Sequence, residues 1–225
     1  MSKGLSAIFN ELSGTLGNTV ASPGPGGITY LRAKPLEVNQ PNSPAQQKQK
    51  TRFSLVQSLA AIMLVFIRSS FKKLKPTHSE YNSFMSINTK ALSDWDDTSS
   101  TDPYTLMATT RGSLAQSNAT MSAANPPVLD TGVLTFDYLS DYDENDENLN
   151  PEDELMFVCV APESGAIRTG ACGVQRSEVN AEVNINVFQG VTSYVAIYFR
   201  SPLDGSVSSS KFAVKLDGNA TATLL

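Results

Sequence analysis

Histidine and cysteine are nearly absent from this chain, which has a single histidine, His78, and two cysteines, Cys159 and Cys172, among its 225 residues. A structural zinc site takes four ligands, mostly of these two types, and a Ser-His-Asp triad needs a histidine beside its serine. No Gly-x-Ser-x-Gly turn accompanies His78. Scaffolds held together by disulfides carry more cysteines. The composition therefore excludes ordinary zinc sites and disulfide scaffolds, and it predicts a protein that is not an enzyme and has no cofactor.

Long apolar runs are also absent. The longest, LAAIMLVFI at residues 59–67, is far shorter than the roughly 20 residues that a membrane-spanning helix needs. The N-terminal residues carry one lysine and no long apolar stretch, so they do not resemble a secretory signal. The apolar fraction of 40% and the charged fraction of 17% are typical of a folded protein. We expect no membrane span, synthesis in the cytoplasm and a final location within an assembled particle.

Charge is plentiful but unevenly distributed. Residues 1–90 contain 11 Lys and Arg and 3 Asp and Glu, a net charge of +8. Residues 91–225 contain 6 and 19, a net charge of −13, which leaves −5 for the whole chain. Charge asymmetry of this kind is informative about binding partners and assembly, and not about a catalysed reaction.

Glycine and proline are concentrated in residues 1–43, where the run PGPGG at 23–27 interrupts any helix. Short β-prone pieces such as ITYL at 28–31 lie between these breaks. A segment of this composition cannot build its own core, so we predict an extended arm that lies on the rest of the chain or on a neighbouring copy. The residues expected to make the contacts of this assembly arm are Gly14, Gly17, Ile28, Tyr30 and Leu31.

Residues 44–90 are predicted to be helical. Ser43 is a candidate N-cap, Pro44 suits a first helical position, and Pro76 ends the first helix. Apolar residues three and four apart predict one long helix as far as residue 75, and a second, shorter helix is expected from about Ser79 to Lys90. The apolar stripe consists of Phe53, Val56, Leu59, Ala60, Met63, Leu64, Ile67 and Phe71.

The long helix also has a predicted basic face. Its cations are Lys48, Lys50, Arg52, Lys72, Lys73 and Lys75, together with Arg68. Phosphate binding needs only cations on one face, so nucleic-acid packaging is one interpretation. Pairing with acidic residues of the same chain or of a neighbour is another, and a solvated surface is a third.

An acidic linker, residues 91–103, surrounds the only tryptophan, Trp95, and leads to residues 104–225, where β-branched and aromatic runs alternate with turn residues. Strands are predicted near 104–110, 132–139, 154–161, 179–188, 192–200 and 211–216, with Cys172 in a glycine-rich loop. Alternation puts Tyr194, Ala196 and Tyr198 on one strand face and Val195, Ile197 and Phe199 on the other. The predicted fold class is α+β: an arm, one long and one short helix, and an antiparallel β-sandwich of immunoglobulin or fibronectin type.

Several pieces of the sequence, in this order, resemble an uncharacterised family of bacterial and phage-borne proteins that carry a domain of unknown function. The pieces are SGTLGNTV at 13–20, GITYLRAKP at 27–35, AQQ at 45–47, RGSL at 111–114, GVLTF at 132–136, and the closing strand and turn at 199–208. The resemblance implies the same layout and a phage or mobile-element context. It supplies no activity, and no functional residue can be carried over from it.

The acidic loop at residues 141–152 can be compared with a calcium-binding EF-hand. Asp141, Asp143, Asn145 and Glu152 occupy positions 1, 3, 5 and 12 of such a loop, and their oxygens suit Ca²⁺. The glycine expected at the sixth position is Asp146, and the flanks are predicted strands rather than helices. A solvated loop, a cation site and a docking surface for a basic partner therefore all remain open.

These observations predict a non-enzymatic structural protein that assembles with itself and with other assembly proteins, as part of a phage capsid or tail. The arm would add a strand to an exposed sheet edge of a neighbouring copy. Complementary charge would set the orientation of the subunits. Two alternatives are a soluble binding module with Ca²⁺ in its acidic loop, and nucleic-acid packaging by the basic helix.

Overall fold

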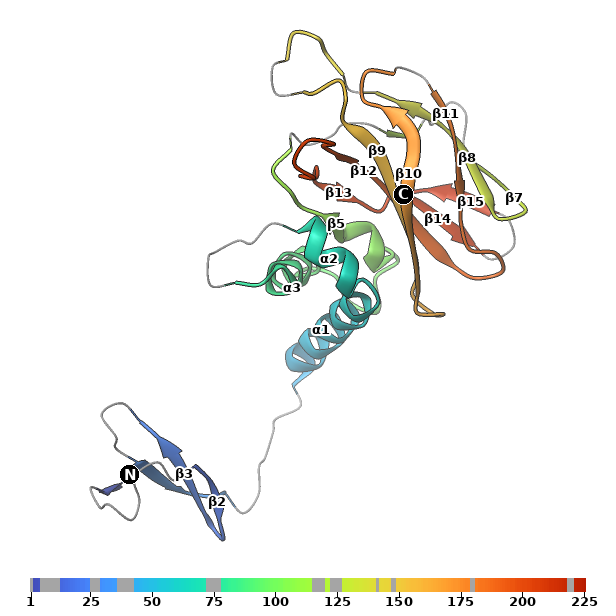
Figure 1. The fold of residues 1–225 in the computed structure, drawn as a ribbon. Helices are drawn as coiled ribbons and strands as arrows, with labels where there is room; N and C mark the ends of the chain where they lie inside the picture. Colours follow the sequence, from blue (N-terminus) through green and yellow to red (C-terminus); the bar gives the residue numbers. More distant parts are fainter. Residues whose placement is uncertain are drawn as a thin grey trace. The chain divides into compact units, whose positions relative to one another are not determined.

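A computed structural model describes residues 2–4, 13–24, 29–35, 43–71, 78–114, 120–121, 127–140, 142–146, 149–178, 181–217 and 221–225. The chain divides into two compact units, Met1–Ser43 and Pro44–Leu225 (Figure 1). The protein is α+β, with helices and antiparallel sheets.

The N-terminal unit is a four-stranded antiparallel sheet with the order β1-β4-β3-β2. Its strands are β1 (Ser2–Gly4), β2 (Gly14–Leu16), β3 (Thr19–Pro23) and β4 (Thr29–Ala33). Gly17 has φ +55° in the short turn between β2 and β3, a conformation that favours glycine. The segment predicted as an extended arm therefore folds back on itself into a sheet, because its β-prone pieces are close enough in sequence to pair as hairpins. Ile28 lies outside the described residues.

The larger unit begins with three helices, α1 (Pro44–Ile62), α2 (Leu64–Ser70) and α3 (Glu80–Ala91). The predicted single long helix was wrong, since α1 and α2 are bent by 87° at Met63. A straight helix through the apolar run at 59–67 would carry part of that run away from the core. The bend lets both Leu59 of α1 and Phe66 of α2 enter one core.

The third helix, α3, agrees with the predicted short helix. The Ser79 hydroxyl caps it by accepting a hydrogen bond of 3.2 Å from the Asn82 N–H. Among the described helices, none is by itself long and apolar enough to cross a bilayer, and only α1 and α2 counted together reach that length.

Two antiparallel sheets form the rest of the unit, with the strand orders β10-β9-β12-β14-β15 and β11-β8-β6, and β7 also pairs with β8. The first contains β9 (Glu154–Ala161), β10 (Ala166–Gln175), β12 (Ser193–Arg200), β14 (Val214–Asp217) and β15 (Thr221–Leu224). The second contains β6 (Thr120–Met121), β7 (Val128–Asp130), β8 (Val133–Leu139) and β11 (Ala181–Asn186). The immunoglobulin or fibronectin topology stays a prediction.

A separate strand pair joins β5 (Ala108–Thr110) to β13 (Ser210–Lys211). The strand predicted at 104–110 is only half present, because a 3-10 helix, η1 (Pro103–Leu106), takes its first part. Asp102 caps η1 by accepting a hydrogen bond of 3.1 Å from the Tyr104 N–H, which favours a helical turn at that point.

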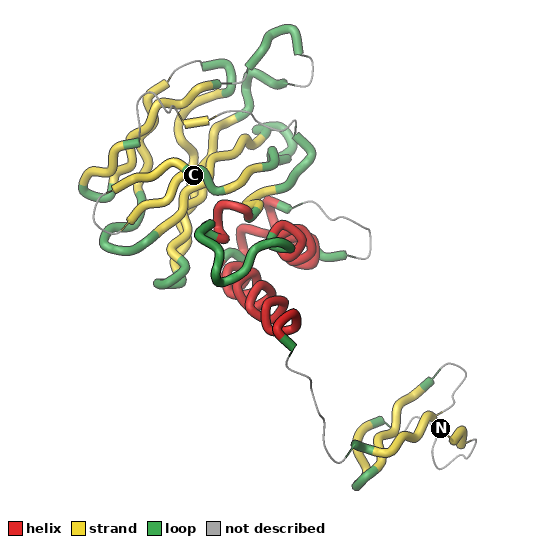
Figure 2. The backbone as a smooth tube through the Cα atoms, turned by 180° about the vertical axis from the view of Figure 1, so that it is seen from behind, coloured by secondary structure: helices red, strands yellow, loops and turns green. Residues whose placement is uncertain are grey.

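The five-stranded sheet is a central layer with a different neighbour on each face. Tyr194, Ala196 and Tyr198 of β12 share one core with the helices, and the Phe66 and Tyr198 rings lie 5.7 Å apart. Val195, Ile197 and Phe199 share a second core with β8 and β11. The two faces of β12 are the ones that its sequence predicts. Figure 2 shows the helices gathered on one side of the strands.

Strand β10 was missed by the sequence analysis, which placed Cys172 in a loop. Cys172 lies in β10, Cys159 lies in β9, and both thiols are free. Glycines made the segment resemble a loop, but Gly170 serves packing, since a Cβ there would lie 2.9 Å from the Phe157 ring. A glycine within a strand can therefore allow a large side chain to approach the backbone closely.

Candidate functional site

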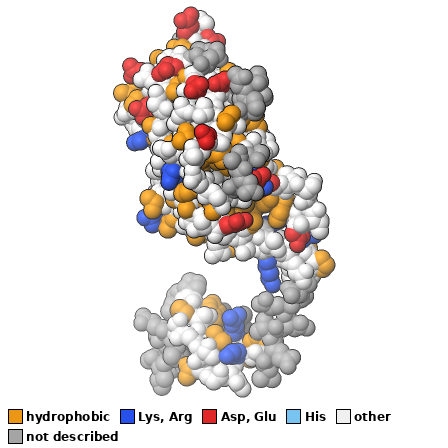
Figure 3. Space-filling view, turned by 90° about the vertical axis from the view of Figure 1, so that its right-hand side faces the viewer, with side chains coloured by type: hydrophobic (Ala, Val, Ile, Leu, Met, Phe, Trp, Pro, Cys, Tyr) orange, Lys and Arg blue, Asp and Glu red, His pale blue; other side chains and the backbone are white. Residues whose placement is uncertain are grey.

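Two turns meet at one end of the larger unit. The first, which is acidic, joins β8 to β9, and the second, residues 176–178, follows β10. The Ser177 N–H donates a 3.2 Å hydrogen bond to the carbonyl of Pro151, and the Arg176 N–H donates one of 2.8 Å to the carbonyl of Asp153. We call their outward carboxylates the acidic end (Figure 3): Asp143, Glu144, Asp146, Glu152, Glu154 and Glu178.

A buried ion pair holds these turns together. Nη1 of Arg176 lies 3.2 Å from Oδ2 of Asp153, and the side chains are 0% and 1% exposed. The guanidinium carbon lies 4.1 Å from the centre of the Phe199 ring, a cation–π contact. The Ser140 hydroxyl also donates to the carbonyl of Arg176. Burial raises the pKa of Asp153, and the Arg176 charge counters part of that rise.

This pair has an electrostatic consequence for the surface. Arg176 and Asp153 carry opposite charges and are both buried, so this pair adds no net charge to the carboxylates on the surface. Arg200, which is exposed, stands in register with Glu154 on the neighbouring strand and offsets one of them. The acidic end therefore keeps most of its negative charge.

The predicted calcium ligands are described only in part, since Asp141 lies outside the described residues. Oδ1 of Asp143 accepts hydrogen bonds from the backbone N–H and side-chain amide of Asn145, at 2.9 and 2.8 Å, and these lower the pKa of Asp143. The Glu152 N–H donates to Oδ1 of Asn150 at 3.1 Å. Within the described ranges, no group of three or more His, Cys, Asp and Glu is placed to hold a metal. Calcium binding stays a prediction.

The first part of the predicted basic face lies against the acidic linker. Nζ of Lys48 is 2.8 Å from Oδ2 of Asp96, and Nε of Arg52 donates to the carbonyl of Trp95. Hydrogen bonds from Lys48 and Thr98 lower the pKa of Asp96 to about 2. Lys72, Lys73 and Lys75 lie outside the described residues. Lys48 and Arg52 thus contact groups of their own chain.

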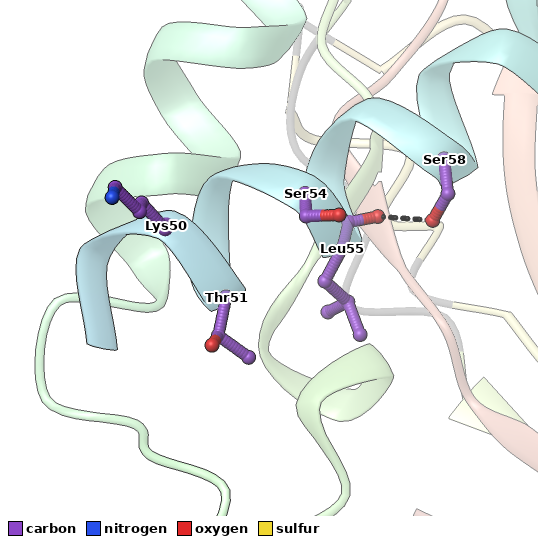
Figure 4. Close-up of a pocket in the computed structure, with 5 residues that line it drawn as sticks. All are labelled: Lys50, Thr51, Ser54, Leu55 and Ser58. Atoms are coloured by element: carbon purple, nitrogen blue, oxygen red, sulfur yellow. Dashed lines mark hydrogen bonds between the residues drawn. The ribbon is translucent and has the colours of Figure 1, made fainter. Parts of the chain in front are cut away.

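Lys50 borders a shallow hollow of about 500 Å³ along α1 (Figure 4). Thr51, Ser54, Leu55 and Ser58 complete its lining, and the Ser58 hydroxyl donates to the carbonyl of Leu55 at 2.8 Å. A surface of one cation and neutral hydroxyls on a single helix offers no acid–base pair for a reaction.

A second hollow, of about 490 Å³, lies on the N-terminal sheet and is lined by Ser22, Tyr30, Leu31 and Arg32. Alternation along β4 and the residue after it puts Tyr30, Arg32 and Lys34 on one side, which we call the β4 face. Arg32 and Lys34 are exposed, and the described part of the unit contains no Asp or Glu. Two more residues of the predicted assembly arm lie in this sheet, Gly14 in β2 and Gly17 in the turn that follows it.

A polar cluster that the sequence did not indicate fixes the acidic linker to the sheet. Oδ2 of Asp102 accepts a 2.7 Å hydrogen bond from the Tyr194 hydroxyl and lies 3.1 Å from Nζ of Lys215. The Tyr104 and Tyr194 rings pack 4.4 Å apart. Burial, with the Asp102 hydrogen bond, strongly raises the pKa of Tyr194. The cluster has a structural role, because the Tyr194 phenol stays protonated at neutral pH and keeps its hydrogen bond to Asp102.

A family model described as a family of unknown function, DUF6266, matches residues 11–213. The chain belongs to the DUF6266 family. The match extends over most of both units, so residues of each unit belong to the region that the DUF6266 family shares. No curated protein and no solved structure matches the chain. DUF6266 membership supports the uncharacterised family that the resemblance indicates, and it carries no activity with it.

Proposed function

We propose that this DUF6266 protein is a non-enzymatic structural protein that assembles with further copies of itself through its N-terminal unit. The observation that carries the proposal is how little this unit buries. Ala21 and Thr29 are its buried side chains within the described ranges, whereas Leu16 is 60% exposed. A β unit of about 40 residues without cysteine gains too little from burial to be stable alone. A surface on another copy would supply the missing burial.

The described side chains of the larger unit support a role without catalysis. Burial raises the pKa of Cys159 and raises that of Cys172 to about 12, so neither thiol forms a nucleophilic thiolate at neutral pH. The two packed sheets suit a rigid β-sandwich that holds assembly surfaces apart. A place in a phage capsid or tail is part of the proposal, and the family resemblance contributes only the phage or mobile-element context.

Light scattering after size exclusion tests the proposal on the full chain and on a variant lacking residues 1–40. We expect a defined oligomer from the full chain. The deletion variant should be a monomer with an unchanged circular dichroism spectrum of the larger unit, because Pro44–Leu225 is compact by itself. A full chain that is monomeric at every concentration would refute self-assembly. A deletion variant that still assembles would show that the N-terminal unit is not the contact.

A further inference from the structure

We propose that the acidic end of one copy binds the β4 face of the N-terminal unit of a second copy. This inference rests on the proposed self-assembly and names the two surfaces that it would use. Both surfaces were defined above from described residues, and they belong to different compact units of the chain.

The acidic end needs a cationic partner. Residues 130–163 contain eleven Asp and Glu and no Lys or Arg. The bond from Ser177 to Pro151 and the buried Arg176–Asp153 pair hold residues 176–178 against residues 151–153, so the segments that carry Glu152, Glu154 and Glu178 stay side by side. Repulsion among fixed like charges is relieved when a surface of opposite sign binds.

The β4 face has the chemistry to be that surface. The planar guanidinium of Arg32 can pair with a carboxylate through two parallel hydrogen bonds, and Lys34 adds a second cation. Tyr30 lines the hollow beside Arg32 and is half-buried in the isolated sheet. Tyrosine and arginine are the residue types that most often dominate binding energy at protein interfaces.

Helix α1 is the competing basic surface, and its own chain already screens it. Lys48 pairs with Asp96, and the same linker places Asp94 and Asp97 nearby in sequence. The described residues of the N-terminal unit contain no acid that would do the same for Arg32 and Lys34. The β4 face is therefore the better electrostatic complement.

A contact between two different surfaces is heterologous. Each copy would offer one acidic end and one β4 face, so two copies can exchange N-terminal units reciprocally, or the contact can repeat into a larger ring or an open filament.

Charge reversal in the full chain tests this contact by sedimentation velocity at low salt. The first variant carries Arg32→Glu and Lys34→Glu, and the second carries Glu144→Lys and Glu152→Lys. Each should raise the dissociation constant at least about tenfold, because like charges then face each other. A chain with all four changes should recover assembly, since the charges are again complementary. Glu163→Lys and Lys211→Glu are matched controls at exposed sites outside both surfaces, and they should assemble like the unchanged protein.

The outcomes separate this inference from the proposed function. An unchanged chain that is monomeric refutes self-assembly itself. An unchanged chain that assembles, with both reversal variants assembling equally well, overturns only the contact proposed here. Weakening by the acidic-end reversal without weakening by the β4-face reversal also overturns it. A contact within one chain would make the effect independent of protein concentration, and that result would contradict a second copy as the partner.

Discussion

Removing the guanidinium of Arg176 should destabilise the protein far more than removing an ion pair at the surface would. In Arg176→Met the Asp153 carboxylate stays 0% exposed but loses its counter-charge. Oδ1 of Asp153 already meets no hydrogen-bond donor among the described residues, so Oδ2 depends on the 3.2 Å contact with Arg176. The cation–π contact with Phe199 disappears as well.

The expected loss is about 3–5 kcal/mol, the range found when one partner of a buried ion pair is removed. For a chain of this size it corresponds to a fall in Tm of about 6–20 °C. Replacing both partners, as in Asp153→Leu with Arg176→Met, should cost about 1 kcal/mol or less, because no buried charge is left unpaired.

Urea denaturation followed by circular dichroism measures both variants. The pKa of Asp153 is already raised by burial and should rise further without Arg176. The native state of Arg176→Met then binds a proton more tightly than the unfolded state, so its stability should increase as the pH falls below 7. A single variant that loses under about 1 kcal/mol, or a double variant as unstable as the single one, would refute this reasoning.

Two further predictions concern the linker and a glycine. Lys48→Met should raise the pKa of Asp96 from about 2 toward its ordinary 3.8, measured by NMR titration, while Thr98 keeps it below that value. Since this folded-state pKa is lowered, the Asp96 contribution to stability is present above about pH 4 and is lost as the pH falls toward 2. In Gly112→Ala the new Cβ would overlap the carbonyl oxygen of Val207, so we expect a loss of about 3 kcal/mol or more in urea denaturation. Gly173→Ala, where a Cβ meets nothing within 4 Å, should lose only about 1–2 kcal/mol through its positive φ; equal losses would contradict the steric explanation.

Local patterns predicted those elements that local interactions determine. The start of α3 follows from a serine cap, and the two faces of β12 follow from strict alternation of side chains. The bend at Met63 could not be predicted, because helical spacing continues through it and only the shape of the core requires the change of direction.

Local patterns also predicted only part of the acidic end. A run of carboxylates marks residues 141–154 in the sequence, but nothing local connects them to Arg176, 23 positions beyond Asp153. No local signal marked Arg176, because Arg168 is the first cation after the long stretch without lysine or arginine. Of the β4 face, the sequence indicated only Tyr30, since the role of Arg32 and Lys34 depends on the absence of acids among the described residues of the folded sheet.

The central position of β12 has a consequence for biosynthesis. Helix α2 ends at Ser70, but β12, the strand that packs on the helices, ends at Arg200, 130 residues later. At a synthesis rate of 5–20 residues per second, the apolar sides of α1 and α2 remain uncovered for about 7–26 s until that strand has been synthesised. During this interval a ribosome-bound chain exposes the hydrophobic surface that chaperones recognise, so the order of the elements makes the nascent protein dependent on protection that the finished one no longer needs.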